Sequence, residues 1–162
     1  MKGFEDATTL VTYLVSNTVA VILLLVAWKK PRIARVLFLL LFSWAASTNW
    51  STVIHQPEVY LEYADLTFWA VYRRFILGWF SQHIVFVVGS IATCQALIAV
   101  AMLLKGWPLD VGIFAAIAFL LAIAPLGVGS AFPFSIIVSI ALYRVYRSPS
   151  NDYLFRSIMP AT

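Results

Sequence analysis

Long runs without charged residues are the feature of this sequence that most limits what it can fold into. One run, Thr8 to Trp28, and a later one, Ile84 to Leu104, each hold about 21 residues, and a helix of that length crosses roughly 30 Å of hydrocarbon. Hydrophobic residues make up 62% of the chain and charged residues 11%, whereas a soluble domain carries about a quarter charged residues. Too few polar side chains are present to cover a water-exposed surface. We therefore expect an all-α integral membrane protein.

The apolar stretch from Leu109 to Tyr146 is too long for one span. A single helix of roughly 38 residues would extend about 57 Å. Its middle carries Pro125 and Pro133 on either side of two glycines, a pattern that turns the chain instead of continuing a helix. Splitting the stretch there predicts a five-helix transmembrane bundle in one membrane domain, with spans at about residues 8–28, 33–50, 84–104, 109–126 and 131–147.

The basic residues predict how this bundle is oriented. The segment Lys29 to Arg35 holds four positive charges, and connectors rich in Lys and Arg stay in the cytoplasm. Five spans place the basic tail with Arg144 and Arg147 on the same side, whereas four spans would export it. We therefore predict a multi-pass protein of the cell membrane with its N-terminus outside and its C-terminus in the cytoplasm. Basic residues at the ends of apolar runs indicate topology, so no nucleic-acid partner is expected.

The region between the second and third spans differs from the rest because it combines acids, arginines and many aromatic rings. We predict one amphipathic helix at about residues 57–80, lying at the outer membrane interface with its rings at headgroup depth. At 3.6 residues per turn, one face of that helix would carry Glu58, Glu62, Asp65, Trp69 and Arg73. A sixth span there would bury five charges, which disfavours it.

Several short elements resemble the DoxX family of small membrane proteins. They are Arg35 at the start of a helix, Pro57-Glu58-Val59-Tyr60 and Tyr72-Arg73-Arg74 in a long outer loop, and the turn Ala124-Pro125-Leu126-Gly127. The resemblance covers roughly residues 35–147 and implies a DoxX-like four-helix core, to which the first helix is an addition. Because the family includes a small subunit of an archaeal thiosulfate:quinone oxidoreductase, it also implies a quinone as ligand and partner subunits in a membrane complex.

The candidate ligand-binding residues lie mainly at the predicted outer end. Arg73 and Arg74 depart from the positive-inside pattern. They would bind lipid phosphate, the acids of their own helix, a quinone headgroup, or an anionic substrate such as a sulfur oxyanion. His55 and His83, together with Glu58, Glu62 and Asp65, could form a metal or proton-handling site at the bundle entrance. No pair has ligand spacing within one helix, so no metal site is predicted.

Gln95 is the candidate inside the bundle. Intramembrane amides usually bond to neighbouring helices, so Gln95 either joins two helices or contacts a ligand. No catalytic motif accompanies it, and the catalytic residues stay unassigned. The single cysteine, Cys94, excludes an internal disulfide and a thiolate cluster, so any redox cofactor would be quinone itself or would belong to a partner.

These observations leave two functional hypotheses. The first is a DoxX-like accessory or quinone-linked subunit of a membrane complex, with the lipid bilayer and partner subunits as its surroundings and no enzymatic activity of its own. The alternative is a small carrier or lipid-binding helical bundle without a redox role, which would use the polar interior around Gln95.

Overall fold

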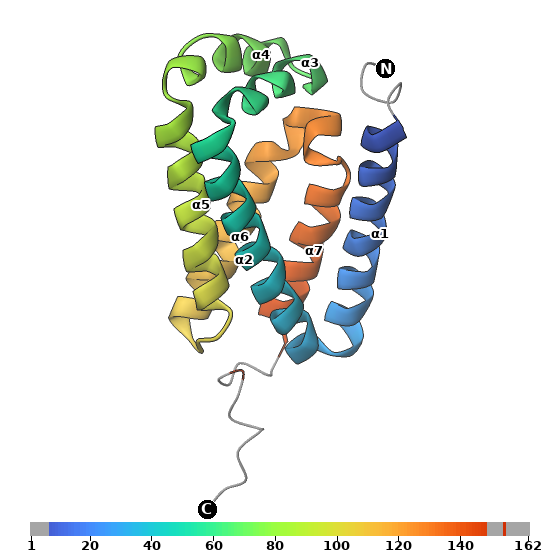
Figure 1. Ribbon diagram of the computed structural model, residues 1–162. Coiled ribbons are helices and arrows are strands. Elements are labelled where there is room, and N and C mark those ends of the chain that lie inside the picture. Colours follow the sequence, from blue (N-terminus) through green and yellow to red (C-terminus); the bar gives the residue numbers. More distant parts are fainter. Residues whose placement is uncertain (1–6, 149–153, 155–162) are drawn as a thin grey trace, which may run out of the picture.

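The computed structural model describes residues 7–148 and Leu154, and every regular element in those residues is helical (Figure 1). Five longer helices form a bundle: α1 (Ala7–Lys29), α2 (Pro31–His55), α5 (Ile84–Ala101), α6 (Trp107–Ile123) and α7 (Phe134–Tyr146). Shorter elements connect them at one end: η1 (Pro57–Glu62), α3 (Tyr63–Leu66), α4 (Ala70–Leu77), η2 (Phe80–Gln82) and η3 (Ala124–Ser130).

The five longer helices pack as a closed ring. α1 contacts α2 and α7, α2 packs against α5, and α6 lies between α5 and α7 (Figure 1). Close approach of α5 and α6 depends on Gly112, because a Cβ at this position would collide with the Cβ of Ala101. The centre of the bundle is filled by fully buried apolar side chains, the largest of which are Phe38, Phe42, Met102, Leu109, Ile113 and Leu142.

Four helices are long and apolar enough to cross a membrane: α1, α2, α5, and α6 together with η3, which continues it to Ser130. α7 is apolar but has only 13 residues. The outward faces of the bundle are also apolar, as expected where lipid replaces water. Among the exposed side chains are Val11, Leu14, Ile22, Leu40, Phe86, Leu97 and Val111. The chain thus has the helices of a multi-pass membrane protein.

The helix boundaries differ from the expected spans mainly in α2. This helix continues to His55, five residues beyond the expected end at Trp50, so Asn49 lies inside it. The stretch with Pro125 and Pro133 does turn the chain, as the sequence indicated. The turn contains Gly127, whose φ of 65° is a left-handed conformation that glycine adopts without strain.

The expected single helix over residues 57–80 is wrong. The segment consists of η1, α3 and α4, followed by η2, and the chain is extended at Thr67 and Trp69 with ψ angles of 144° and 126°. The break arises because Thr67 and Phe68 donate hydrogen bonds to another part of the chain, the carbonyl of Pro125. The acids at Glu58 and Glu62 and the arginines of α4 therefore do not share one helical face.

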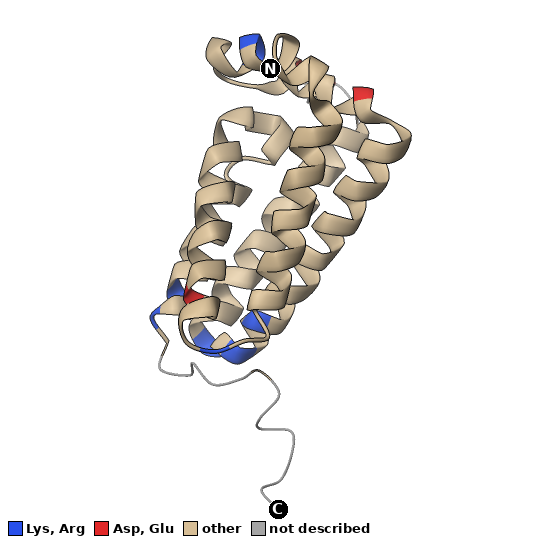
Figure 2. Ribbon diagram, turned by 90° about the vertical axis from the view of Figure 1, so that its left-hand side faces the viewer, with Lys and Arg blue, Asp and Glu red and all other residues tan. Residues whose placement is uncertain are grey.

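The two ends of the bundle differ in charge. The turns α1–α2 and α5–α6 and the end of α7 lie at the same end, and Figure 2 shows most of the lysines and arginines there. These basic residues are Lys29, Lys30, Arg32, Lys105 and Arg144. The opposite end holds the 57–82 segment with Arg73 and Arg74. Basic clusters that are far apart in the sequence thus form one basic end.

Arg35 is the buried member of this basic end. Only 1% of it is exposed, and its guanidinium group donates hydrogen bonds to two carbonyls that follow α5. Nη2 lies 2.8 Å from the oxygen of Met102 and 2.6 Å from that of Leu104, and Nε lies 3.2 Å from the former. Carbonyls at the C-terminus of a helix have no partner within the helix, so Arg35 of α2 satisfies them and joins α2 to the end of α5.

Replacing Arg35 with methionine should destabilise the bundle. Arg35→Met keeps an unbranched apolar side chain but leaves the carbonyls of Met102 and Leu104 without their donor, at a cost of about 3 kcal/mol. The measurement is the free energy of unfolding by a denaturing detergent in mixed micelles. The matched control is Arg32→Met, because Arg32 is exposed at the same end. Equal stability of the two variants would contradict the capping role of Arg35.

Candidate functional site

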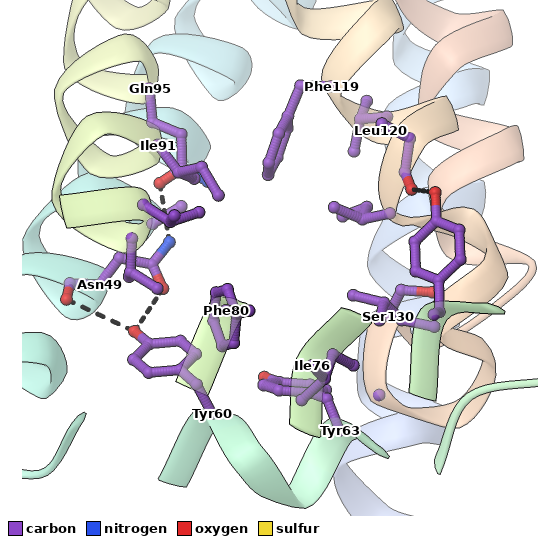
Figure 3. A pocket seen from close by; sticks show the side chains of 18 of the residues that line it. Asn49, Tyr60, Tyr63, Ile76, Phe80, Ile91, Gln95, Phe119, Leu120 and Ser130 are labelled. Atoms are coloured by element: carbon purple, nitrogen blue, oxygen red, sulfur yellow. Dashed lines mark hydrogen bonds between the residues drawn. The ribbon is translucent and has the colours of Figure 1, made fainter. Parts of the chain in front are cut away.

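A cavity of about 460 Å³ lies inside the ring at the end opposite the basic one (Figure 3). It is enclosed by α2, α5, α6 and η3 and covered by residues 57–82, which we call the lid. Its volume is within the range of small-molecule sites in proteins, about 300–1,000 Å³. The residues that line it include Leu41, Phe42, Trp44, Tyr63, Tyr72, Phe75, Ile76, Phe80, Val88, Ile91, Phe119, Leu120, Ile123, Leu126 and Phe134.

The wall of the cavity is almost wholly apolar, and aromatic rings come to it from seven different elements of the bundle and the lid. None of the described residues that line it is Asp, Glu, Lys, Arg or His. An ion taken from water into such a site would lose its hydration without gaining a charged partner. The cavity is therefore suited to an uncharged molecule.

The main polar feature of the wall is a chain of hydrogen bonds that leads from the lid into the bundle (Figure 3). Tyr60 of η1 donates its hydroxyl proton to Oδ1 of Asn49 at 2.9 Å, and Nδ2 of Asn49 donates to Oε1 of Gln95 at 2.8 Å. Burial raises the pKa of Tyr60 above its usual value, so the hydroxyl keeps the proton it donates at neutral pH. The chain links the lid to α2 and α2 to α5.

The lid is attached to the other side of the cavity through backbone carbonyls at the end of α6. Thr67 Oγ1 and the backbone nitrogen of Phe68 donate to the oxygen of Pro125 at 2.7 Å and 3.1 Å. Tyr72 donates its hydroxyl proton to the oxygen of Ala122 at 2.7 Å. These carbonyls are available because the α-helix ends at Ile123 and Pro125 has no N–H with which to continue it.

Two glycines of η3 allow the lid to pack directly on the backbone. A Cβ at Gly129 would collide with the ring of Tyr63, and a Cβ at Gly127 would lie 2.8 Å from the oxygen of Leu66 and 3.0 Å from the ring of Phe68. Burial raises the pKa of Tyr63, as expected for a phenol held against protein instead of water. The two glycines that indicated a turn in the sequence thus also form the surface on which the lid packs.

Gln95 is the one predicted candidate residue that lines the cavity. Arg73 and Arg74 lie on α4 and are exposed, as are Glu58 and Glu62 on η1. Arg73 pairs with Asp65 through an Nη2–Oδ1 distance of 3.3 Å, but both side chains are more than half exposed, and such pairs contribute little to stability.

His83 also lies outside the cavity lining. Its ring stacks on that of Trp79, with centroids 4.3 Å apart, and its Nδ1 is 2.8 Å from the oxygen of Trp79. Within residues 7–148 and Leu154, no three or more His, Cys, Asp or Glu side chains are grouped closely enough to hold a metal ion. The predicted outer residues are therefore not brought together into one site.

The sequence did not indicate the other members of the polar chain. Asn49 falls at the end of the expected span over residues 33–50, and Tyr60 falls in the predicted interfacial helix over residues 57–80. The sequence did contain a signal for the Asn49–Gln95 bond, because two successive apolar runs each carry an amide. Amide side chains within a membrane commonly form hydrogen bonds between helices.

Comparisons of the chain with models of protein families, with curated proteins and with solved structures found no match.

Enlarging Gly129 should displace the lid. In Gly129→Ala the new methyl group collides with the Tyr63 ring, and overpacking of this kind costs about 1–3 kcal/mol. The measurement is the unfolding free energy of Gly129→Ala, of Tyr63→Ala and of the double variant. Because removal of the ring removes the collision, Gly129→Ala should be nearly neutral when Tyr63 is already Ala. Additive effects of the two substitutions would show that the contact does not hold the lid.

Proposed function

We propose that this chain is a membrane protein that binds an uncharged, lipophilic molecule in the cavity beneath its lid. The observation that carries the proposal is the cavity itself: about 460 Å³, walled by aromatic and aliphatic side chains, without a charged residue among the described ones. A pocket of this size and composition, with a few convergent polar groups, is the usual form of a small-molecule site.

The position of exposed residues at the rim supports entry of the ligand from the bilayer. Trp44 of α2 and Phe75 of α4 line the cavity and are 67% and 46% exposed, and Ala122 of α6 is exposed as well. Since α2 and α6 would be surrounded by lipid, the cavity opens sideways, toward the hydrocarbon. A lipophilic ligand would reach it without passing through water.

The proposal includes five spans, with α7 as the fifth and the basic end in the cytoplasm. Support comes from the gathering of basic residues at the end where the α1–α2 and α5–α6 turns lie. The end of α7 lies there too, and Arg144 in its last turn suits the cytoplasmic side. The lid then lies at the outer interface, where its exposed Trp69, Phe75 and Trp79 would contact the headgroup region.

In the first version of this proposal, the protein is a quinone-linked or accessory subunit of a membrane complex, as the resemblance to the DoxX family implies, and the cavity binds the quinone. A quinone ring is uncharged and would stack on the aromatic walls. The described lining carries no carboxylate, imidazole or thiol to exchange protons or electrons with it, so a partner subunit would carry out the redox step. In the second version the protein is a lipid carrier, which the sideways opening favours.

Filling the cavity should abolish ligand binding while leaving the bundle intact. In Ile91→Trp an indole is introduced at a residue of the cavity wall, whereas in Val85→Trp it is introduced on the same helix at a side chain that is 57% exposed. Each protein is purified in mild detergent and its co-purifying small molecules are identified by mass spectrometry. The unaltered chain and Val85→Trp should retain a lipophilic molecule that Ile91→Trp lacks, and identical extracts from all three would argue against the proposal.

The orientation is tested with reporters at the C-terminus. Fusion of a fluorescent protein that matures only in the cytoplasm should give fluorescent cells, because five spans and the basic end place the tail inside. Fusion of a phosphatase that is active only after export should give inactive cells. Phosphatase activity at the C-terminus would rule out the five-span topology.

A further inference from the structure

Gln95 has a hydrogen-bond donor that the protein does not use. Its Oε1 accepts the proton of Asn49 Nδ2 at 2.8 Å, so its own Nε2 amide group keeps both N–H bonds. The Tyr60 hydroxyl supports this orientation, because its proton goes to the oxygen of the Asn49 amide and the nitrogen then faces Gln95. No group in the described part of the chain accepts a hydrogen bond from Gln95 Nε2.

The unused donor belongs to a residue that lines the cavity and is only 4% exposed. Nε2 is not among the described side-chain atoms that are fully buried without a partner, so a molecule in the cavity can reach it. An acceptor atom placed against Nε2 would form a hydrogen bond there, and the gain would appear as binding affinity.

From this donor, and resting on the proposed function, we infer that the cavity selects an uncharged apolar molecule that presents a carbonyl oxygen to Gln95 Nε2. A carboxylate or phosphate would also accept, but the described wall offers no cation to balance its charge. A hydroxyl oxygen would also accept, but its proton would then need an acceptor of its own in a largely apolar wall. A carbonyl only accepts. Esters and quinones share this chemistry.

The test uses pairs of uncharged probes of similar size and shape, one with carbonyl groups and one without. Methyl palmitate is compared with hexadecane, and decylbenzoquinone with decylbenzene, each bound to the purified full-length protein and quantified by native mass spectrometry. One hydrogen bond of ordinary strength corresponds to roughly tenfold in affinity, so at least one carbonyl probe should bind roughly tenfold more tightly than its hydrocarbon partner. The pair that shows the preference identifies the source of the carbonyl.

The preference should depend on Gln95. In Gln95→Leu the ratio of the two affinities should fall to about one. If Gln95→Leu does not fold, Gln95→Met, which has an unbranched side chain, is tested in its place and should give the same ratio. The control is Thr93→Val, which removes a polar group from an outward position of α5 that does not line the cavity. Because a ratio is measured, a general loss of stability does not imitate the result.

Three results would overturn the inference. A ratio near one in the unaltered protein would show that the carbonyl is not recognised. A ratio that persists in Gln95→Leu and Gln95→Met would assign the recognition to another residue, and tighter binding of palmitate than of its methyl ester at neutral pH would show that the ligand is charged. In the first two cases the cavity still binds an uncharged lipophilic molecule and the proposed function stands. The third result, or no binding of any probe, would overturn the proposed function as well.

Discussion

The backbone carbonyls that remain without an intrahelical partner where the helices end govern much of this structure. Where such a carbonyl is shielded from water, a donor elsewhere in the protein must pair with it. At the basic end, Arg35 satisfies the carbonyls of Met102 and Leu104 after α5. At the other end, Tyr72 and the Thr67–Phe68 pair satisfy those of Ala122 and Pro125 after α6. Asn17 of α1 donates to the carbonyl of Ala131 in the turn before α7 at 2.9 Å.

Each of these bonds also joins segments that are distant in the sequence. Arg35 connects α2 to the α5–α6 turn, and Asn17 connects α1 to the turn before α7, so the ring is tied at both ends. The bonds from Thr67, Phe68 and Tyr72 hold the lid over the cavity. One physical requirement, the pairing of free carbonyls, thus both closes the bundle and forms the roof of its cavity.

The cavity exists because the ring is not filled evenly. Near the basic end α2 also contacts α7 across the ring, and side chains such as Phe38, Met102 and Leu142 fill the centre. Toward the lid the helices enclose open volume, bounded by rings and by the Tyr60–Asn49–Gln95 chain. Packing supplies stability at one end of the molecule, and the volume available for a ligand lies at the other. The polar chain lies beside that volume and leaves one amide donor, Gln95 Nε2, unused. This donor gives an otherwise apolar site a way to select ligands that carry an acceptor atom.

The sequence alone determined that the chain is helical and suited to a membrane, because runs of about 20 apolar residues have few other uses. It also indicated the turn at residues 125–133, since proline and glycine act on the local backbone. It singled out Gln95, because an amide within an apolar run must find a partner.

Only the tertiary structure decided the rest. The break at Thr67, the partners of Arg35, and the meeting of Tyr60, Asn49 and Gln95 all depend on contacts between residues far apart in the chain. The expectation of one helix over residues 57–80 was wrong for this reason: helical periodicity is a local property, and the carbonyl of Pro125 that interrupts it lies almost sixty positions later, at a sequence separation of 58 from Thr67. Local propensity fixes where helices can form, whereas long-range hydrogen bonds and packing decide where they stop and what they enclose.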